Sequence, residues 1–275
     1  MNINKAFKGV IATAMLLGAT FSAQAGVKQF TVDDDLTAGE SLVTADQIDG
    51  NYVQLITVNP DLTFDASIFA SLSTLVLDNS NISGTGIGST YGVYATLVSS
   101  GQVLPGVPAP GFFSLAGFSG ELNLWLDVNN DTDVTFGATG SDAMTYGGTD
   151  SDDIKLGTGT DTGGTGLILP GGFAGLFDIL FVEFALTVAG ADYFVAPDPF
   201  YAKAQTDGDI DVFDLGAVPG TQEITGQLSV VFVPEPSFAC ASGHFRLLHL
   251  WMNLLFYLMF YVYREPSEQY PVAWR

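Results

Sequence analysis

Apolar side chains recur at every second position in several short segments of this chain, and Gly, Asn, Asp or Pro separate the segments. Between Leu122 and Val128, for example, aliphatic residues alternate with Asn123, Trp125 and Asp127. This period of two places the aliphatic side chains on one face, as in a half-buried strand. Alternating, β-branched and aromatic patterns predict strands over residues 52–58, 72–77, 91–98, 122–128, 180–188 and 227–233.

Amphipathic helical spacing is hard to find, so we predict an all-β fold, an antiparallel β-sandwich-like single domain over residues 26–232. Two segments interrupt the strand pattern. Residues 104–111 contain three prolines, which withhold backbone donors from a strand ladder. Residues 157–166 consist of Gly, Thr and one Asp, and we expect this low-complexity tract to be a mobile loop.

The first 25 residues have the features of a secretory signal peptide. Two lysines precede an apolar run over residues 10–17, and the small residues Ala23 and Ala25 fit the positions before a signal peptidase cut. Cleavage after Ala25 would leave Gly26 as the first residue of the mature chain. The apolar run is shorter than the ~20 residues of a membrane-spanning helix. We therefore interpret it as an export signal rather than a retained anchor.

The expected domain is strongly acidic. Residues 26–236 hold 28 of the 30 acids and only three bases, which gives this stretch a net charge of −25. Nucleic acids and anionic lipids bind largely through Lys and Arg that neutralise phosphate, so neither is an expected partner. Cations, neutral glycans and other proteins remain open as partners, and solubility outside the cell is the simplest reason for the charge.

The same stretch contains neither Cys nor His. This absence excludes a Cys nucleophile, a Ser-His-Asp triad and a His-ligated zinc site within residues 26–236. We therefore predict that the chain is not an enzyme. One alternative is a secreted glycan-active hydrolase, because two carboxylates suffice to cleave a glycosidic bond. Another is a small-ligand or glycan-binding module.

One acidic cluster offers side-chain oxygens at alternate positions, as a hard cation such as calcium requires. Its sixth position is Thr132 rather than Gly and its twelfth is Ala138 rather than Glu, so it is not an EF-hand. A solvated turn is the competing interpretation, because Asp and Asn bond to nearby backbone in turns. The predicted calcium ligands are Asp127, Asn129, Asp131 and Asp133.

Two weaker acidic clusters are further candidates for a cation. One comprises Asp207, Asp209 and Asp211 with Asp214 nearby, and the other comprises Asp150, Asp152 and Asp153. Both have carboxylates close together in the sequence, as a cation site requires, but such clusters are more often solvated turns.

The composition changes abruptly beyond Val233. The motif Pro234-Glu235-Pro236 is followed by an aromatic-rich stretch over residues 245–263. Residues 247–263 are apolar enough for a marginal membrane span, with a buried core helix as the alternative. We predict that residues 233–275 form a tail that associates transiently with the membrane.

An export signal, a C-terminal Pro234-Glu235-Pro236 motif and an apolar stretch after it together resemble the PEP-CTERM proteins. The resemblance implies that residues 233–275 are a sorting tail recognised by a membrane enzyme of the exosortase type. Segments of the body resemble the flocculation-associated PEP-CTERM proteins in the same order. These segments are residues 31–33, 44–52, 91–94, 124–127, 152–154, 199–201 and 224–226.

This resemblance implies a function. It implies a protein of the cell surface or extracellular matrix of a Gram-negative bacterium, made together with exopolysaccharide and required for cells to aggregate into flocs or biofilm. The implied partners are exopolysaccharide and other matrix proteins.

The tail departs from the family pattern, which closes a smooth apolar span with a cluster of Arg. Here Arg264 stands alone and is followed by Glu265 and Pro266. A frameshift shortly after Ser237 would explain why residue usage and charge balance both change there. An alternative reading frame that encodes an apolar span and an Arg cluster would support this interpretation, and its absence would refute it.

Overall fold

The structure is a computed structural model. It describes residues 28–36, 41–148, 152–172 and 174–234. The predicted signal peptide, with Ala23, Ala25 and Gly26, lies outside the described residues, and so do Glu235 and Pro236 of the sorting motif. The chain divides into two compact units, residues 1–234 and 235–275, and only the first contains described residues. Within the described ranges, no helix is long and apolar enough to cross a membrane.

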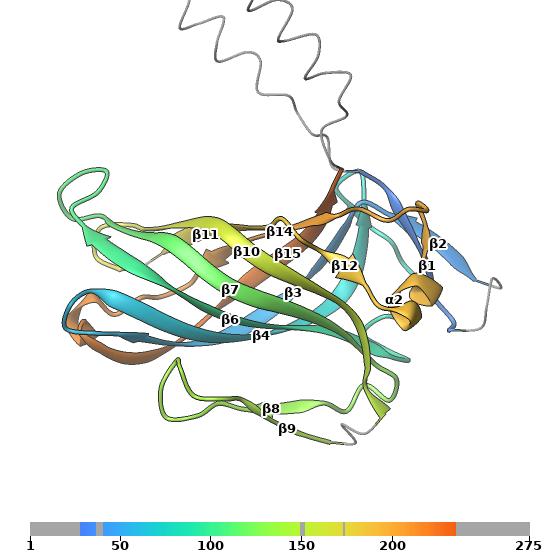
Figure 1. Cartoon of the computed structure of the whole chain (residues 1–275), viewed down its shortest axis with the longest axis horizontal. Helices are drawn as coiled ribbons and strands as arrows, with labels where there is room; N and C mark the ends of the chain where they lie inside the picture. Colours follow the sequence, from blue (N-terminus) through green and yellow to red (C-terminus); the bar gives the residue numbers. More distant parts are fainter. Residues whose placement is uncertain (1–27, 37–40, 149–151, 173, 235–275) are drawn as a thin grey trace, which may run out of the picture. The chain divides into compact units, whose positions relative to one another are not determined.

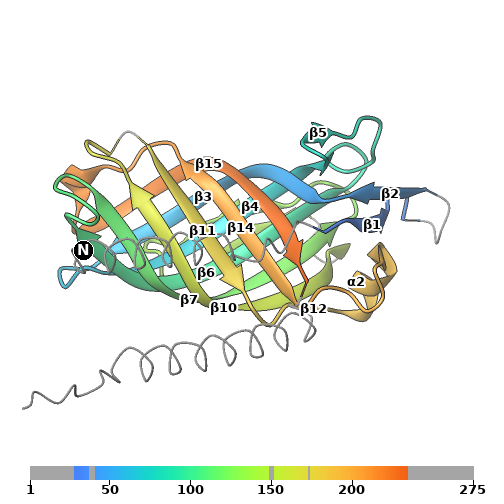
Figure 2. The ribbon, with the colours of Figure 1, turned by 90° about the horizontal axis from the view of Figure 1, so that it is seen from above.

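Eight long antiparallel strands form the body of the domain and close into a barrel-like sheet (Figures 1 and 2). Neighbours around the sheet follow one another along the chain, and the last of the eight pairs with the first. The strands are β3 (Gln47–Val58), β4 (Thr63–Leu77), β6 (Gly92–Pro105), β7 (Phe113–Asp127), β10 (Ile154–Ile168), β11 (Gly175–Phe181), β14 (Lys203–Ile210) and β15 (Gly220–Val233). Short strands β5 (Ser80–Asn81) and β12 (Ala185–Leu186) extend this sheet.

Smaller elements cover the closed sheet. A three-stranded sheet and a short helix gather at one end of it: β1 (Phe30–Asp33), β2 (Leu42–Ala45), β13 (Phe194–Ala196) and α2 (Val188–Tyr193) (Figure 2). The hairpin of β8 (Asp133–Thr135) and β9 (Thr145–Gly147) lies along the wall, where Ser67 Oγ donates to the Gly140 carbonyl over 2.9 Å (Figure 1). A 3₁₀ turn, η2 (Leu215–Ala217), precedes β15.

Alternation along the strands fills the interior. On β11, Phe177, Ile179 and Phe181 are buried, whereas Leu176 and Asp178, at alternate positions, are exposed. Near the end that carries α2, the Phe232 ring meets the rings of Phe30, Phe194 and Phe200 at centroid distances of 5.2, 5.3 and 4.8 Å. Burying each such side chain contributes about 1.5–3 kcal/mol. A packed aromatic core, without any disulfide among the described residues, therefore holds this end of the domain together.

The predicted all-β, antiparallel β-sandwich-like single domain is confirmed, with the refinement that its wall closes on itself. The predicted strands at residues 52–58, 72–77, 122–128 and 227–233 lie within or at the ends of long strands of the wall. The prediction over residues 180–188 is partly wrong, because β11 ends at Phe181 and helix α2 begins at Val188. Thr187 begins this helix by accepting a hydrogen bond from the Gly190 backbone amide over 3.0 Å.

The prediction of a mobile loop at residues 157–166 is wrong, because this glycine-rich tract is the middle of β10. It is paired on both sides, with β7 and with β11. A Cβ atom on Gly157 would lie 2.8 Å from Cζ of Phe184, so the absence of a side chain lets an aromatic ring pack against the strand. The proline-rich segment does interrupt the wall, because β6 ends at Pro105 and β7 begins at Phe113.

Candidate functional site: an acidic groove on the outer face

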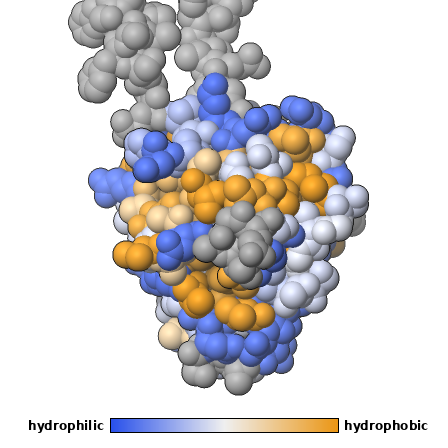
Figure 3. Space-filling model, turned by 90° about the vertical axis from the view of Figure 1, so that its right-hand side faces the viewer, coloured by the Kyte–Doolittle hydropathy of each residue, from blue (hydrophilic) through white to orange (hydrophobic). Residues whose placement is uncertain are grey.

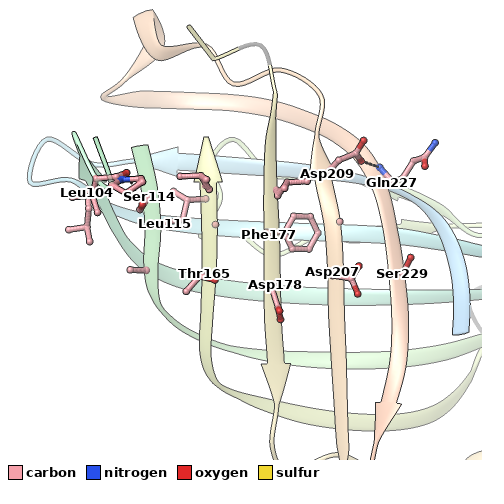
Figure 4. A pocket seen from close by; sticks show the side chains of 17 residues that line it. Leu104, Ser114, Leu115, Thr165, Phe177, Asp178, Asp207, Asp209, Gln227 and Ser229 are labelled. Carbon is pink, nitrogen blue, oxygen red and sulfur yellow. Dashed lines mark hydrogen bonds between the residues drawn. The ribbon is translucent and has the colours of Figure 1, made fainter. Parts of the chain in front are cut away.

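A groove with a volume of about 900 Å³ crosses the outer face of β7, β10, β11, β14 and β15 (Figure 4). Its two sides differ in chemistry. Leu104, Val107 and Pro108, from the end of β6 and the loop after it, line the apolar side together with Leu176, which is 63% exposed. The opposite side is lined by carboxylates, amides and hydroxyls from β11, β14 and β15: Asp178, Asp207, Asp209, Gln227 and Ser229.

The strand register places carboxylates in a line across the sheet. Asp178 on β11 lies directly opposite Asp207 on β14, and Asp207 lies opposite Ser229 on β15. Ser229 in turn lies opposite Asp49 on β3. Side chains of directly opposed residues share one face with Cβ atoms about 4.5–5.5 Å apart, and like charges in this arrangement are destabilising. We call Asp178, Asp207 and Asp49 the acidic row.

The members of the acidic row differ in their surroundings. Asp49 accepts hydrogen bonds from Gln47 Nε2 over 2.6 Å and from Ser229 Oγ over 2.8 Å. Asp178 accepts one from Gln205 Nε2 over 3.0 Å. Partial burial, reinforced by the charges of Asp178 and Asp49, raises the pKa of Asp207. The environment of the central carboxylate, Asp207, therefore opposes its ionisation.

Two inward-facing aromatic rings support the strands under the groove. The rings of Tyr52 and Phe177 meet edge to face at a centroid distance of 5.4 Å. A Cβ atom on Gly208 would lie 2.6 Å from the Phe177 ring, and one on Gly226 would lie 2.8 Å from the Tyr52 ring. Tyr52 also donates to the Asp209 carbonyl over 2.8 Å. Because these contacts hold β14 and β15 in place from the interior, the carboxylates on the outer face of the sheet are attached to rigid strands.

The structure separates the acids of the 207–214 cluster. Asp207 and Asp209 line the groove, and Asp209 Oδ1 accepts from the Gln227 backbone amide over 2.5 Å (Figure 4). Asp211 instead accepts from Thr225 Oγ1 over 3.0 Å, and Asp214 caps η2 by accepting from the Gly216 amide over 2.8 Å. The four acids therefore do not converge on one point.

Asp127, the first predicted calcium ligand, organises the loop after β7. It is 4% exposed, and its carboxylate accepts from the backbone amides of Asn129 over 3.2 Å and Thr132 over 2.9 Å. Burial acts to raise the pKa of Asp127, but hydrogen bonds from the backbone and side chain of Thr132, together with those from the backbone of Asp131 and Asn130, outweigh burial and lower it. Its oxygens thus serve as the acceptors of a turn.

The other predicted ligands of this cluster are spread around the loop. Asn129 Nδ2 donates to Asp152. Asp131 and Asp133 are exposed to solvent. Across the described residues, no group of three or more His, Cys, Asp or Glu is arranged to hold a metal ion. Calcium at this cluster remains a prediction.

The third acidic cluster ties the same loop to the start of β10. Asp153 accepts from Tyr94 Oη over 2.7 Å and from Thr132 Oγ1 over 3.1 Å. Burial is the main cause that raises the pKa of Asp153, and the charges of Asp127 and Asp152 add to it. Asp150 lies outside the described residues. Asp152 and Asp153 thus connect the loop after β7 to the start of β10, and this is a structural role.

Trp125 belongs to an aromatic cluster on the wall. Its ring stacks on Tyr94 at a centroid distance of 6.1 Å, and Lys155 Nζ lies 4.9 Å from the ring centre. The same ammonium donates to Asn123 Oδ1 over 2.7 Å. Packing against these neighbours, rather than stacking on a free ligand, is the role that these contacts support.

Sequence reasoning identified Asp207 and Asp209 but missed Asp178 and Asp49 as their neighbours. Asp178 and Asp49 lie far from Asp207 along the chain, and each is the only acid in its strand. Only the register of four strands brings them into one row. The available signal was the alternation on β11, which places Asp178 on the outer face.

Comparison with known proteins does not assign this chain to a family. No protein family model matches the sequence, and neither a curated protein nor a solved structure matches the chain. The functional argument therefore rests on the geometry and charge of the groove and on the resemblance of the sequence motifs.

Proposed function

We propose that this chain is an exported, non-catalytic protein of the cell surface or extracellular matrix that supports flocculation and biofilm formation by binding exopolysaccharide. The observation that carries the proposal is the open groove with an acidic row on one side and aliphatic side chains on the other. Sugar hydroxyls donate hydrogen bonds to carboxylates, and the C–H faces of sugar rings pack against apolar side chains. The groove offers both surfaces side by side.

The charge of the groove limits the glycan class. Asp178, Asp207 and Asp209 would repel an anionic polymer, because the described lining holds no Lys or Arg to offset them. Neutral polysaccharides and those with amino sugars fit this lining. An anionic polymer fits only with a bridging cation.

Calcium is the cation we propose for such bridging. Asp178 and Asp207 face each other across two strands, and a divalent cation would relieve the repulsion between them. The loop cluster of Asp127, Asn129, Asp131 and Asp133 is a second proposed location, through its exposed acids. Bridging through either cluster would link chains to each other or to the matrix.

Sorting is the remaining part of the proposal. Pro234 directly follows β15, so the sorting motif would begin where the closed sheet ends. An exosortase-type enzyme would act on this tail after export, while the tail is transiently associated with the membrane.

A glycan-active hydrolase is the second candidate, and one observation favours it. Asp178 and Asp207 are directly opposed, and the pKa of Asp207 is raised, as for the general acid of a carboxylate pair. Retaining glycosidases hold their two carboxyl groups about 5–5.5 Å apart, and directly opposed strand positions allow two carboxyl groups to come this close. In this case Asp207 would be the acid and Asp178 the nucleophile.

Floc formation tests the proposal in cells. A strain that lacks the gene would be complemented with the intact chain, with the Asp178→Asn/Asp207→Asn double variant, with Glu223→Gln as a charge control, or with a chain ending at Val233. We expect the intact chain and Glu223→Gln to restore flocs, and the other two to fail. Normal flocs without the gene would refute the proposal, and turnover of exopolysaccharide by the purified chain would favour the hydrolase.

A further inference from the structure

A second groove lies at the other end of β7 and β10, beside α2, and has a volume of about 850 Å³. Figure 3 shows apolar side chains gathered on this end of the molecule. Residues from β1, β7, β10, α2 and β13 and from the turns after β1 and β7 line the groove, including Leu36, Val128, Ile154, Ala191 and Val195. Its size and mostly apolar lining are those of small-molecule sites, which have volumes of about 300–1,000 Å³.

Several of these apolar side chains are exposed. Leu36 is 37% exposed, Ile154 38% and Val195 36%, and the neighbouring Val188 on α2 is 84% exposed. A contiguous exposed apolar patch on a soluble domain marks an interaction site. Leu36 also has a φ of 57°, in the left-handed region that disfavours a residue with a branched side chain. The turn thus holds an aliphatic side chain at the rim in a backbone conformation that is unfavourable for it.

The charged side chains that line this groove are all acidic. Asp33 is 4% exposed at its floor, and Asp192 is exposed at its rim. Tyr193 is also part of the lining, but its hydroxyl already shares a hydrogen bond of 3.1 Å with the Tyr91 hydroxyl. Tyr91 in turn donates to Asp34 Oδ1 over 2.8 Å. A ligand entering from solvent therefore meets apolar walls and carboxylates.

We infer that this groove binds a small cationic amphiphile, with its hydrocarbon part against Ile154, Ala191 and Val195 and its amine toward Asp192 and Asp33. The charge favours an amine because no Lys, Arg or His is present in the described lining. A second copy of the chain is the less suitable occupant, because residues 26–236 of each copy carry a net charge of −25 and repel one another. This site is separate from the acidic groove and does not depend on the proposed function.

The test is a titration of the purified chain with three probes of equal chain length: octylamine, octanoate and octanol. Isothermal calorimetry at 150 mM NaCl would measure each affinity, with circular dichroism to verify that the fold is intact. We expect octylamine to bind at least tenfold more tightly than octanol and octanoate to show no binding. Ala191→Trp or Val195→Trp should fill the groove and weaken octylamine binding at least tenfold.

A second pair of variants separates the proposed site from general attraction to an acidic protein. Asp192→Asn should lower the preference for octylamine over octanol by about threefold or more, whereas Glu223→Gln, an equal loss of charge elsewhere, should leave it unchanged. Three outcomes would overturn the inference: no binding of octylamine at millimolar concentration, binding that both Trp variants leave intact, or self-association in sedimentation that the Trp variants abolish.

Discussion

The two groups of acids on the wall of this domain, the loop cluster after β7 and the acidic row across β11, β14 and β3, are opposite in construction. In the loop, Asp127 accepts hydrogen bonds from backbone amides two and five residues further along the chain. In the row, Asp178 and Asp207 face each other directly. The acid of the loop thus stabilises a turn, whereas acids brought side by side by strand register repel one another and oppose folding.

Removing Asp127 should give the largest effect. Asp127→Ala leaves the backbone amides of Asn129 and Thr132 without this acceptor, and the Asp127 side chain that is removed is buried. We expect the free energy of unfolding to fall by about 2–3 kcal/mol, measured by urea denaturation. Asp133→Ala, at an exposed acid of the same loop, is the control and should change stability by less than about 0.5 kcal/mol. Equal effects of the two variants would contradict the structural role of Asp127.

A side chain added beneath the groove should also destabilise the domain. The Cβ atom of Gly208→Ala would lie 2.4 Å from the Gln227 carbonyl oxygen and 2.6 Å from the Phe177 ring. We expect a loss of about 1–3 kcal/mol in the same denaturation experiment, because the wall and the ring must both shift. Gly163→Ala, where an added Cβ meets nothing within 4 Å, provides the matched control. A neutral Gly208→Ala would mean that the floor of the groove is not tightly packed.

Neutralising Asp207, the central member of the acidic row, should increase the stability of the domain rather than decrease it. Asp207→Asn keeps the shape of the side chain and removes its repulsion with Asp178 and Asp49. Because Asp207 is exposed and solvent screens this repulsion, we expect a gain of only about 0.2–0.5 kcal/mol in unfolding free energy. Glu223→Gln controls for the general benefit of lowering the net charge. A loss of stability in Asp207→Asn beyond that of Glu223→Gln would show that the row is not in conflict with folding.

The pH dependence of stability should differ between the two groups. The pKa of Asp207 is raised in the folded state, so its unfavourable contribution is absent below the unfolded pKa of about 3.8 and develops as pH rises through the folded pKa. The pKa of Asp127 is lowered, so its stabilisation is present above 3.8 and is lost as pH falls through its folded pKa. In melts across pH 3–7, the gain of Asp207→Asn and the loss of Asp127→Asn should therefore both be largest at the neutral end of the range and smallest at the acidic end. The reverse pattern would contradict the assigned environments.

The fold was largely predictable because alternation is a local property. Leu122, Leu124 and Leu126 mark the inner face of β7 without reference to any other strand, and the structure buries all three. The glycine tract in β10 was missed because its strand conformation depends on partners, β7 and β11 on either side and the rings of Phe181 and Phe184 against Gly159 and Gly157. No local pattern in the tract carries that information.

The candidate site was less predictable for the same reason. Alternate acids at Asp207 and Asp209 suggested a cation site, but their partner Asp178 is identified only once β11 and β14 are paired in register. Asp127 shows the converse, because spacing favourable for calcium is also the spacing of a turn whose amides bind the same oxygens. Sequence proximity alone cannot distinguish these two uses.

The most direct measurement of the central claim is the equilibrium binding of purified exopolysaccharide to the purified chain, compared with the Asp178→Asn/Asp207→Asn double variant. We predict that the double variant binds at least tenfold more weakly while its unfolding free energy is unchanged or higher, and that Glu223→Gln binds like the intact chain. Undiminished binding by a folded double variant would contradict the assignment of the acidic groove as the glycan site.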